Sequence, residues 1–250
     1  MGVFRRAIEK HSVGRFGFHA TMLPDMLVTE YTLIQLVIDV SSSATAYRHR
    51  MKDLIKEIVR ASLRSERRHN IMLRVVVAGT TPFEVHGFKL LTECDPADYD
   101  CVFGTGGLTA LYDATLDGIE AVANFSHFLM QNDFLANAMI FVITDGRDNY
   151  SAASPNEVNK ALVQAVQDDD LESLTAMLIG ILGVANKTAI AYKEESGLLR
   201  RFKKDVGFTH YMELDLLNDH ELANMTEYIC NSIRAVNHAL GSGCLPSLPI

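Results

Sequence analysis

Residues 31–38, YTLIQLVI, form an almost continuously apolar run that is rich in branched and aromatic side chains. Such a run is typical of a strand covered on both faces of a sheet. It ends in Asp39, and the hydroxyl side chains of Ser41 and Ser43 follow before a helical pattern begins. From residue 46 the apolar residues recur with a period of about 3.6, with basic residues opposite, which predicts an amphipathic helix. The segment therefore predicts a buried strand, a polar loop and a covering helix.

The same alternation continues along the chain. Further apolar runs predict strands at residues 71–78, 83–91, 138–144, 174–182 and 209–214. Helical patterns lie between or after them, at 109–130, from 154 onward, at 193–206 and from 218 to about 241. The short turn GTTP makes 71–78 and 83–91 antiparallel neighbours. The prediction is an α/β, doubly wound, mostly parallel six-stranded sheet with one antiparallel edge strand and helices on both faces.

Length and composition favour one compact domain. The chain has 250 residues, 48% of them hydrophobic and 22% charged, which is the composition of a globular protein. We expect residues 1–30 to form an N-terminal extension packed on the domain, 31–240 to form the domain, and 241–250 to be a loose C-terminal tail. The basic N-terminal stretch lacks an apolar run of signal-peptide or membrane-span length, so a cytoplasmic protein without membrane insertion is expected. A net charge of -8 argues against general nucleic-acid binding.

Oxygen-bearing side chains follow three of the predicted segments. Asp39, Ser41 and Ser43 follow the first strand, Thr109 opens the second long helix, and Asp145 follows the strand at 138–144. In a doubly wound sheet these positions share the carboxyl edge, where ligands gather. Two carboxylates there repel unless a proton or cation lies between them. Carboxylate and hydroxyl oxygens suit magnesium, manganese or calcium better than zinc or copper.

Each residue has a simpler interpretation when it is considered alone. Serine and threonine after a strand are common helix caps, and aspartate followed by glycine is common in tight turns. Asp113 and Asp148, which lie beside the motifs, are better explained as hydrogen-bond partners or turn residues than as ligands. The arrival of all three segments at one predicted edge is what favours a metal site.

The motifs DVSSS at 39–43, GGLTALYDA containing Thr109, and ITDGRDN containing Asp145 resemble the metal-ion-dependent adhesion site of von Willebrand factor A domains. The order of elements agrees over about residues 31–240. The resemblance implies that Ser41 and Ser43 coordinate the metal directly and that Thr109 does so directly or through water. Asp39 and Asp145 would act mostly through coordinated water.

This sequence departs from the family pattern at two places. Val40 replaces a small residue of the first motif, and Leu108 is inserted between the glycines and Thr109. The resemblance also implies a sixth coordination position for an acidic residue of a partner protein. Intracellular family members of bacteria and their viruses, the type this chain resembles, often work beside ATPases or within larger assemblies.

Three functions are compatible with these motifs. The leading hypothesis is a non-enzymatic, divalent-cation-dependent module that binds an Asp or Glu of a partner protein. The second is a metal-assisted hydrolase or phosphatase using the same edge, although the sequence has no GxSxG elbow and no P-loop lysine after GTGG. The third is a structural subunit in which the metal site is degenerate.

Overall fold

The computed structural model describes residues 8–13, 16–21, 29–40, 48–100, 107–182, 189–215 and 218–239. The strands are β1 (Ile8–Val13), β2 (Phe16–Thr21), β3 (Glu30–Asp39), β4 (Ile71–Ala78), β5 (Pro82–Leu90), β6 (Leu135–Thr144), β7 (Ser173–Leu182) and β8 (His210–Asp215). The helices are α1 (Arg48–Leu63), α2 (Leu111–Gln131), α3 (Pro155–Gln167), α4 (Ala189–Val206) and α5 (Asp219–Ala239). Short 3-10 turns lie at Arg68–Asn70, Leu91–Glu93 and Pro96–Tyr99.

All the described strands join one sheet in the order β1-β2-β5-β4-β3-β6-β7-β8. The strands β3, β4, β6, β7 and β8 run parallel to one another. β5 runs antiparallel to β4, and β2 runs parallel to β5. β3 lies between β4 and β6, and all its residues after Glu30 are buried. This position explains why its sequence is apolar on both faces.

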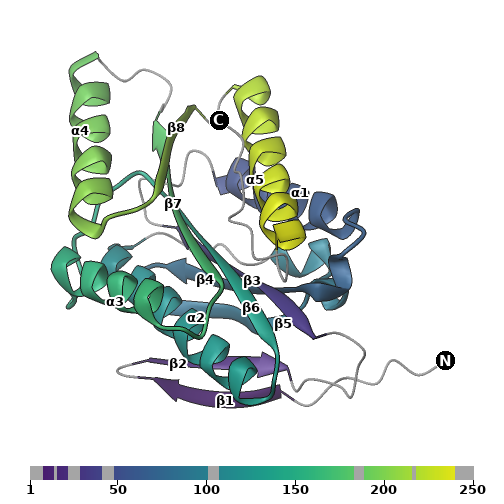
Figure 1. Ribbon diagram of the computed structural model, residues 1–250. Helices are drawn as coiled ribbons and strands as arrows, with labels where there is room; N and C mark the ends of the chain where they lie inside the picture. Colours follow the sequence, from purple (N-terminus) through teal and green to yellow (C-terminus); the bar gives the residue numbers. More distant parts are fainter. Residues whose placement is uncertain are drawn as a thin grey trace.

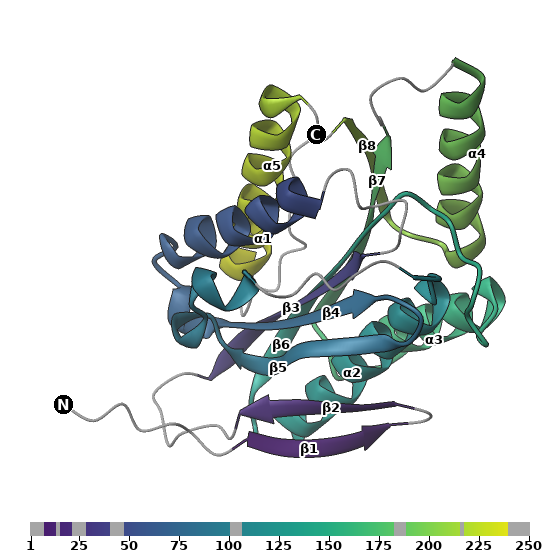
Figure 2. The same ribbon diagram turned by 180° about the vertical axis from the view of Figure 1, so that it is seen from behind.

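Helices cover both faces of the sheet (Figures 1 and 2). On one face α2, α3 and α4 pack on side chains such as Leu33, Val37 and Val76. On the other face α1 and α5 pack on the alternate side chains, among them Ile34, Leu36 and Val75. The predicted α/β class, the mostly parallel sheet and the two helical layers are therefore present.

The predicted number and arrangement of strands were wrong. The sheet has eight strands rather than six, and the antiparallel strand β5 is not at the edge, because the hairpin of β1 and β2 continues the sheet beyond it. The two added strands have six residues each and mix charged, polar and small residues with apolar ones. Local propensity alone does not specify such segments as strands. Their pairing depends on the tertiary environment, where Phe18 and Ala20 become buried.

Helix boundaries follow the predicted local signals. At the start of α3, Ser154 Oγ accepts a hydrogen bond from the Glu157 amide, while the Ser154 amide donates to the Glu157 carboxylate. At the end of α4, Gly207 adopts a left-handed φ of 82°, which glycine tolerates without strain. Asn218 Oδ1 accepts bonds from the amides of His220 and Glu221 at the start of α5. These capping contacts use short-range chemistry that is visible in the sequence.

Candidate metal centre

Asp39 and Asp145 lie at the carboxyl edge of two neighbouring strands. β3 and β6 are paired in parallel up to Ile38 and Ile143, so the strand ends meet at one level. Both carboxylates are buried. Thr144 Oγ1 donates a hydrogen bond of 2.7 Å to Asp39 Oδ2. The same hydroxyl accepts a bond from the Gly146 amide, so one threonine links the first carboxylate to the turn that carries the second.

The turn after β6 is held by its backbone and by α4. Asp145 Oδ1 accepts a hydrogen bond of 3.2 Å from the Arg147 amide, the contact typical of an aspartate turn. Gly146 has a left-handed φ of 85°. A Cβ atom at Gly146 would lie 2.8 Å from a methyl group of Leu199. The turn therefore requires glycine both for its conformation and for its packing.

Thr109 is brought to the same edge by its main chain. Its amide donates a 2.7 Å bond to Asn149 Oδ1, and its carbonyl accepts bonds from the amides of Asn149 and Tyr150. The next residue, Ala110, donates a 2.7 Å bond to the carbonyl of Gly79, just beyond β4. Thr109 is therefore fixed between the loop after β6 and the end of β4, and its side chain is buried.

Two further acidic residues brace this arrangement. Asp148 Oδ1 accepts bonds from the amides of Leu111 and Tyr112 at the start of α2, and from Ser151 Oγ. In return, the Asp113 carboxylate on α2 accepts bonds from the amides at positions 152 and 153. Asp148 thus does from a distant loop what an N-cap residue does locally. Both residues therefore make hydrogen bonds, which is one of the two roles expected of them from the sequence. The interpretation of Thr109 as the cap of α2 is wrong, because Ala110 occupies that position.

The predicted ligand set is thus partly placed. Asp39, Thr109 and Asp145 lie in segments that meet at the carboxyl edge. Ser41 and Ser43 lie outside the described residues. Within the described parts of the chain, no group of three His, Cys, Asp or Glu side chains could hold a metal ion. The edge offers two carboxylates and a hydroxyl instead, and this donor chemistry fits a hard divalent cation that retains water ligands.

Two supporting residues, Thr144 and Asn149, were not predicted from the sequence. Both lie within four residues of Asp145. A hydroxyl at the last position of a strand, level with an aspartate on the next strand, is a signal that could have indicated Thr144. The role of Asn149 depends on a loop returning to Thr109, and only the folded chain shows that return.

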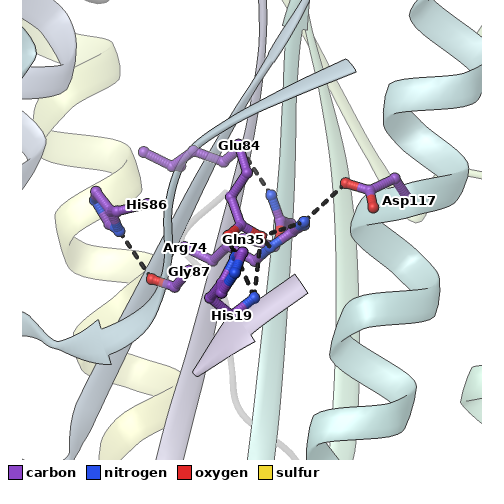
Figure 3. A network of polar contacts seen from close by, with 8 residues as sticks. His19, Gln35, Arg74, Glu84, His86, Gly87 and Asp117 are labelled. Atoms are coloured by element: carbon purple, nitrogen blue, oxygen red, sulfur yellow. Dashed lines mark hydrogen bonds and ion pairs between the residues drawn. The ribbon is translucent and has the colours of Figure 1, made fainter. Parts of the chain in front are cut away.

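A second polar cluster, which was not predicted from the sequence, lies between the sheet and α2 (Figure 3). Arg74 on β4 is fully buried. Its guanidinium donates bonds of 2.9 Å to Gln35 on β3, Glu84 on β5 and Asp117 on α2. Burial raises the pKa of Asp117, and the Arg74 charge opposes that rise. Glu84 also contacts His19 on β2, with 2.6 Å between Glu84 Oε1 and His19 Nδ1.

Near this cluster, on the opposite face of β5, His86 is held neutral. Its Nε2 lies 2.8 Å from the Tyr99 hydroxyl, and its Nδ1 lies 2.9 Å from the Gly87 carbonyl. Because a carbonyl accepts only, Nδ1 carries the proton and Nε2 accepts from Tyr99. Burial lowers the pKa of His86 to about 4, and burial also raises the pKa of Tyr99.

Comparisons with known proteins identify the fold. No protein-family model matches the sequence, and a search among curated proteins finds no match. Similar solved structures include the von Willebrand factor type A protein from Catenulispora acidiphila, with 13% identity, a TM-score of 0.52 and coverage of 92% of this chain and 50% of that chain. The fold is von Willebrand factor A-like.

Two other similar solved structures are those of a pilus adhesin and a mussel byssus protein. The pilus adhesin SpaC from Lactobacillus rhamnosus GG has 10% identity and a TM-score of 0.55, over 93% of this chain and 35% of that chain. Proximal thread matrix protein 1 from the mussel byssus, with a zinc-occupied MIDAS motif, has 18% identity and a TM-score of 0.51, over 82% of this chain and 48% of that chain. The present chain thus spans half or less of the length of all three proteins.

None of the described helices is both long and apolar enough to span a membrane.

Proposed function

We propose that this chain is a divalent-cation-dependent protein-binding module. Asp39, Ser41, Ser43, Thr109 and Asp145 would hold the cation at the carboxyl edge, and an aspartate or glutamate of a partner protein would complete its coordination. The observation that carries the proposal is the convergence of Asp39, Thr109 and Asp145 at one edge, from segments far apart in the sequence. The zinc-occupied MIDAS motif of the mussel protein supports a divalent ion on this fold.

The residues of this chain prepare the edge for a cation. Thr144 orients the Asp39 carboxylate, and the Arg147 amide orients that of Asp145. Asn149 fixes the main chain of Thr109. A bound cation would supply positive charge that attracts a carboxylate. Hard oxygen donors favour magnesium, with manganese and calcium as alternatives, over zinc.

The proposed partner is a protein with an accessible acidic side chain, and the proposed role is non-enzymatic. By analogy with the intracellular members that the motifs resemble, the partner would be an ATPase or a component of a larger assembly in the cytoplasm. The rim of the carboxyl edge would supply specificity.

The first test is direct cation binding. Titration calorimetry with magnesium, manganese and calcium should give one site in the wild-type chain and a loss of at least tenfold in affinity for Asp39→Asn and Asp145→Asn. Asp168→Asn is a matched control, because Asp168 is exposed at the end of α3. Equal affinity in all variants would exclude this edge as the binding site. No binding in the wild type would favour the structural subunit with a degenerate site.

The second test concerns the partner. Proteins that the wild-type chain retains from native extract should be lost when the cation is chelated, and Asp39→Ala should not retain them. Restoring magnesium after chelation should restore retention by the wild type. Retention that is unchanged by both treatments would contradict the proposal. Turnover of a generic phosphoester that disappears in Asp39→Ala would support the hydrolase alternative instead.

A further inference from the structure

Among the described residues, the hairpin of β1 and β2, called here the edge hairpin, has few backbone links to the rest of the sheet. β2 and β5 share a single register pair, Ala20 with Phe88. By contrast, β3 and β6 are paired continuously from Glu30 with Leu135 to Ile38 with Ile143. Elements with few cooperative backbone bonds open at lower free energy than the core of a sheet. The edge hairpin therefore depends on side-chain contacts for its docking.

One of those contacts is polar and partly open to solvent. The His19 amide donates to both oxygens of Glu84, at 3.2 and 3.3 Å, and His19 Nδ1 lies 2.6 Å from Glu84 Oε1. The His19 side chain is 45% exposed, whereas that of Glu84 is 16% exposed. Solvent therefore reaches the hairpin side of the contact, while Glu84 is held from inside by Arg74.

The other contact is aromatic. Phe18 on the hairpin packs edge-on against Phe88 of β5 and Phe125 of α2, with ring centroids 6.2 and 6.1 Å apart. His11 stacks on Phe18 at 4.9 Å and also meets Phe128. The hairpin thus covers apolar rings of β5 and α2 that belong to the main core.

Gly87 makes this docking sterically possible. A Cβ atom on Gly87 would lie 1.9 Å from the His19 carbonyl oxygen and 2.3 Å from its carbon. The φ angle of Gly87 lies outside the left-handed region, so alanine is compatible with its backbone conformation. Only the approach of the hairpin requires glycine at this position.

The contact with Glu84 continues into the interior. Arg74 joins Glu84 on one side to Asp117 on the other, and Asp117 lies in the second turn of α2. The buried carboxylate of Asp117 and the partly exposed carboxylate of Glu84 share one guanidinium. A change at either carboxylate therefore alters how strongly Arg74 interacts with the other. A continuous chain of contacts therefore links His19 on the edge hairpin to Asp117 on α2 (Figure 3). The first turn of the same helix frames the carboxyl edge.

We propose that the edge hairpin is a conformational latch, which opens and closes on β5 independently of the central sheet. The contact of His19 with Glu84 holds it closed, and Glu84, Arg74 and Asp117 transmit its docking to α2. Opening would expose the outer edge of β5 together with Phe88 and Phe125. This inference does not depend on whether the carboxyl edge binds a cation.

Hydrogen exchange of backbone amides in the full chain tests the latch. Gly87→Ala should expel the hairpin, so that amides at 16–21 exchange at least 100-fold faster while those of β3 and β6 keep their wild-type rates. His19→Ala removes one charge-assisted hydrogen bond and should accelerate exchange at 16–21 about tenfold. His210→Ala is the matched control, since His210 lies on β8 at the opposite edge of the sheet.

Transmission is read in the same experiment on the amides at 115–121 of α2. Their exchange should rise about threefold in His19→Ala and in Glu84→Gln, and should not change in His210→Ala. Wild-type rates at 16–21 in both Gly87→Ala and His19→Ala would overturn the latch. Equal acceleration throughout the sheet would also overturn it, because the hairpin would then open only with the whole domain. An open hairpin with unchanged amides in α2 would overturn the transmission.

Discussion

The Arg74 cluster and the carboxyl edge both bury acidic side chains, but they treat the negative charge differently. In the cluster, Asp117 and Glu84 share the positive charge of one guanidinium, which also binds Gln35. At the edge, Asp39 receives a hydroxyl and Asp145 a backbone amide. Those two donors are neutral groups that orient the carboxylates. The first arrangement suits internal structure, whereas the second suits the binding of an external cation.

The largest expected effect is in the Arg74 cluster. Arg74→Met should lower the free energy of unfolding by about 3–5 kcal/mol, because it leaves two carboxylates beside each other without their cation. Urea unfolding measures the change. Arg200→Met is the control, since Arg200 is exposed and its pair with Glu213 lies at the surface; its effect should stay below about 1 kcal/mol. Similar losses in both variants would show that burial does not distinguish the two ion pairs.

At the carboxyl edge, the free energy of unfolding should depend on a bound cation more than on the charge of Asp39 itself. At magnesium concentrations about 100 times the dissociation constant, binding would stabilise the wild type by about 2.7 kcal/mol. Asp39→Asn should lose this increment and keep wild-type stability in chelator to within about 1 kcal/mol. Thermal unfolding with and without magnesium measures both quantities. Equal magnesium stabilisation of the variant would remove the proposed difference between the two regions.

Burial of His86 should make the free energy of unfolding depend on pH. Its pKa falls to about 4 in the folded state, whereas an unfolded histidine has a pKa of about 6.5. The unfolded state therefore binds more protons between these values, so the stabilisation is complete above pH 6.5 and declines as pH falls toward 4. Unfolding at pH 7 and pH 5 should show a loss about 1–2 kcal/mol greater in wild type than in His86→Gln. An equal loss in both would contradict burial of a neutral His86, and His210→Gln controls for general histidine effects.

The smallest effect concerns the brace of the edge. Asp148→Ala should cost about 1 kcal/mol of unfolding free energy, because the amides at the start of α2 lose their acceptor. It should also accelerate hydrogen exchange of the Leu111 amide more than that of any amide in α3. A uniform change in both helices would mean that Asp148 acts on the domain as a whole and does not cap α2.

Local patterns accounted for much of the fold and for part of the site. The buried strands, the capping box at Ser154 and the helix exit at Gly207 follow from hydrophobic periodicity and short-range hydrogen bonding. Asp39 and Asp145 could be placed at one edge because parallel strands that share a sheet end at the same side. Those inferences need only neighbours in sequence or a simple rule of topology.

The remaining features depend on contacts between distant segments. The edge hairpin has no strong strand pattern, and it joins the sheet where Gly87 leaves room and Phe18 finds Phe88. The sequence does not indicate that Arg74 lies inside the domain, because a lone arginine in an apolar run carries no sign of its acceptors on β3, β5 and α2.

The sequence by itself determined the α/β alternation, the buried central strands and the oxygen-rich motifs after them, because periodicity and local chemistry are properties of adjacent residues. Only the tertiary structure decided the eight-stranded order, the Arg74 cluster and the bracing of Thr109 by Asn149. The physical reason is that burial and charge compensation are set by residues far apart in the chain, whose meeting depends on the packing of the whole domain.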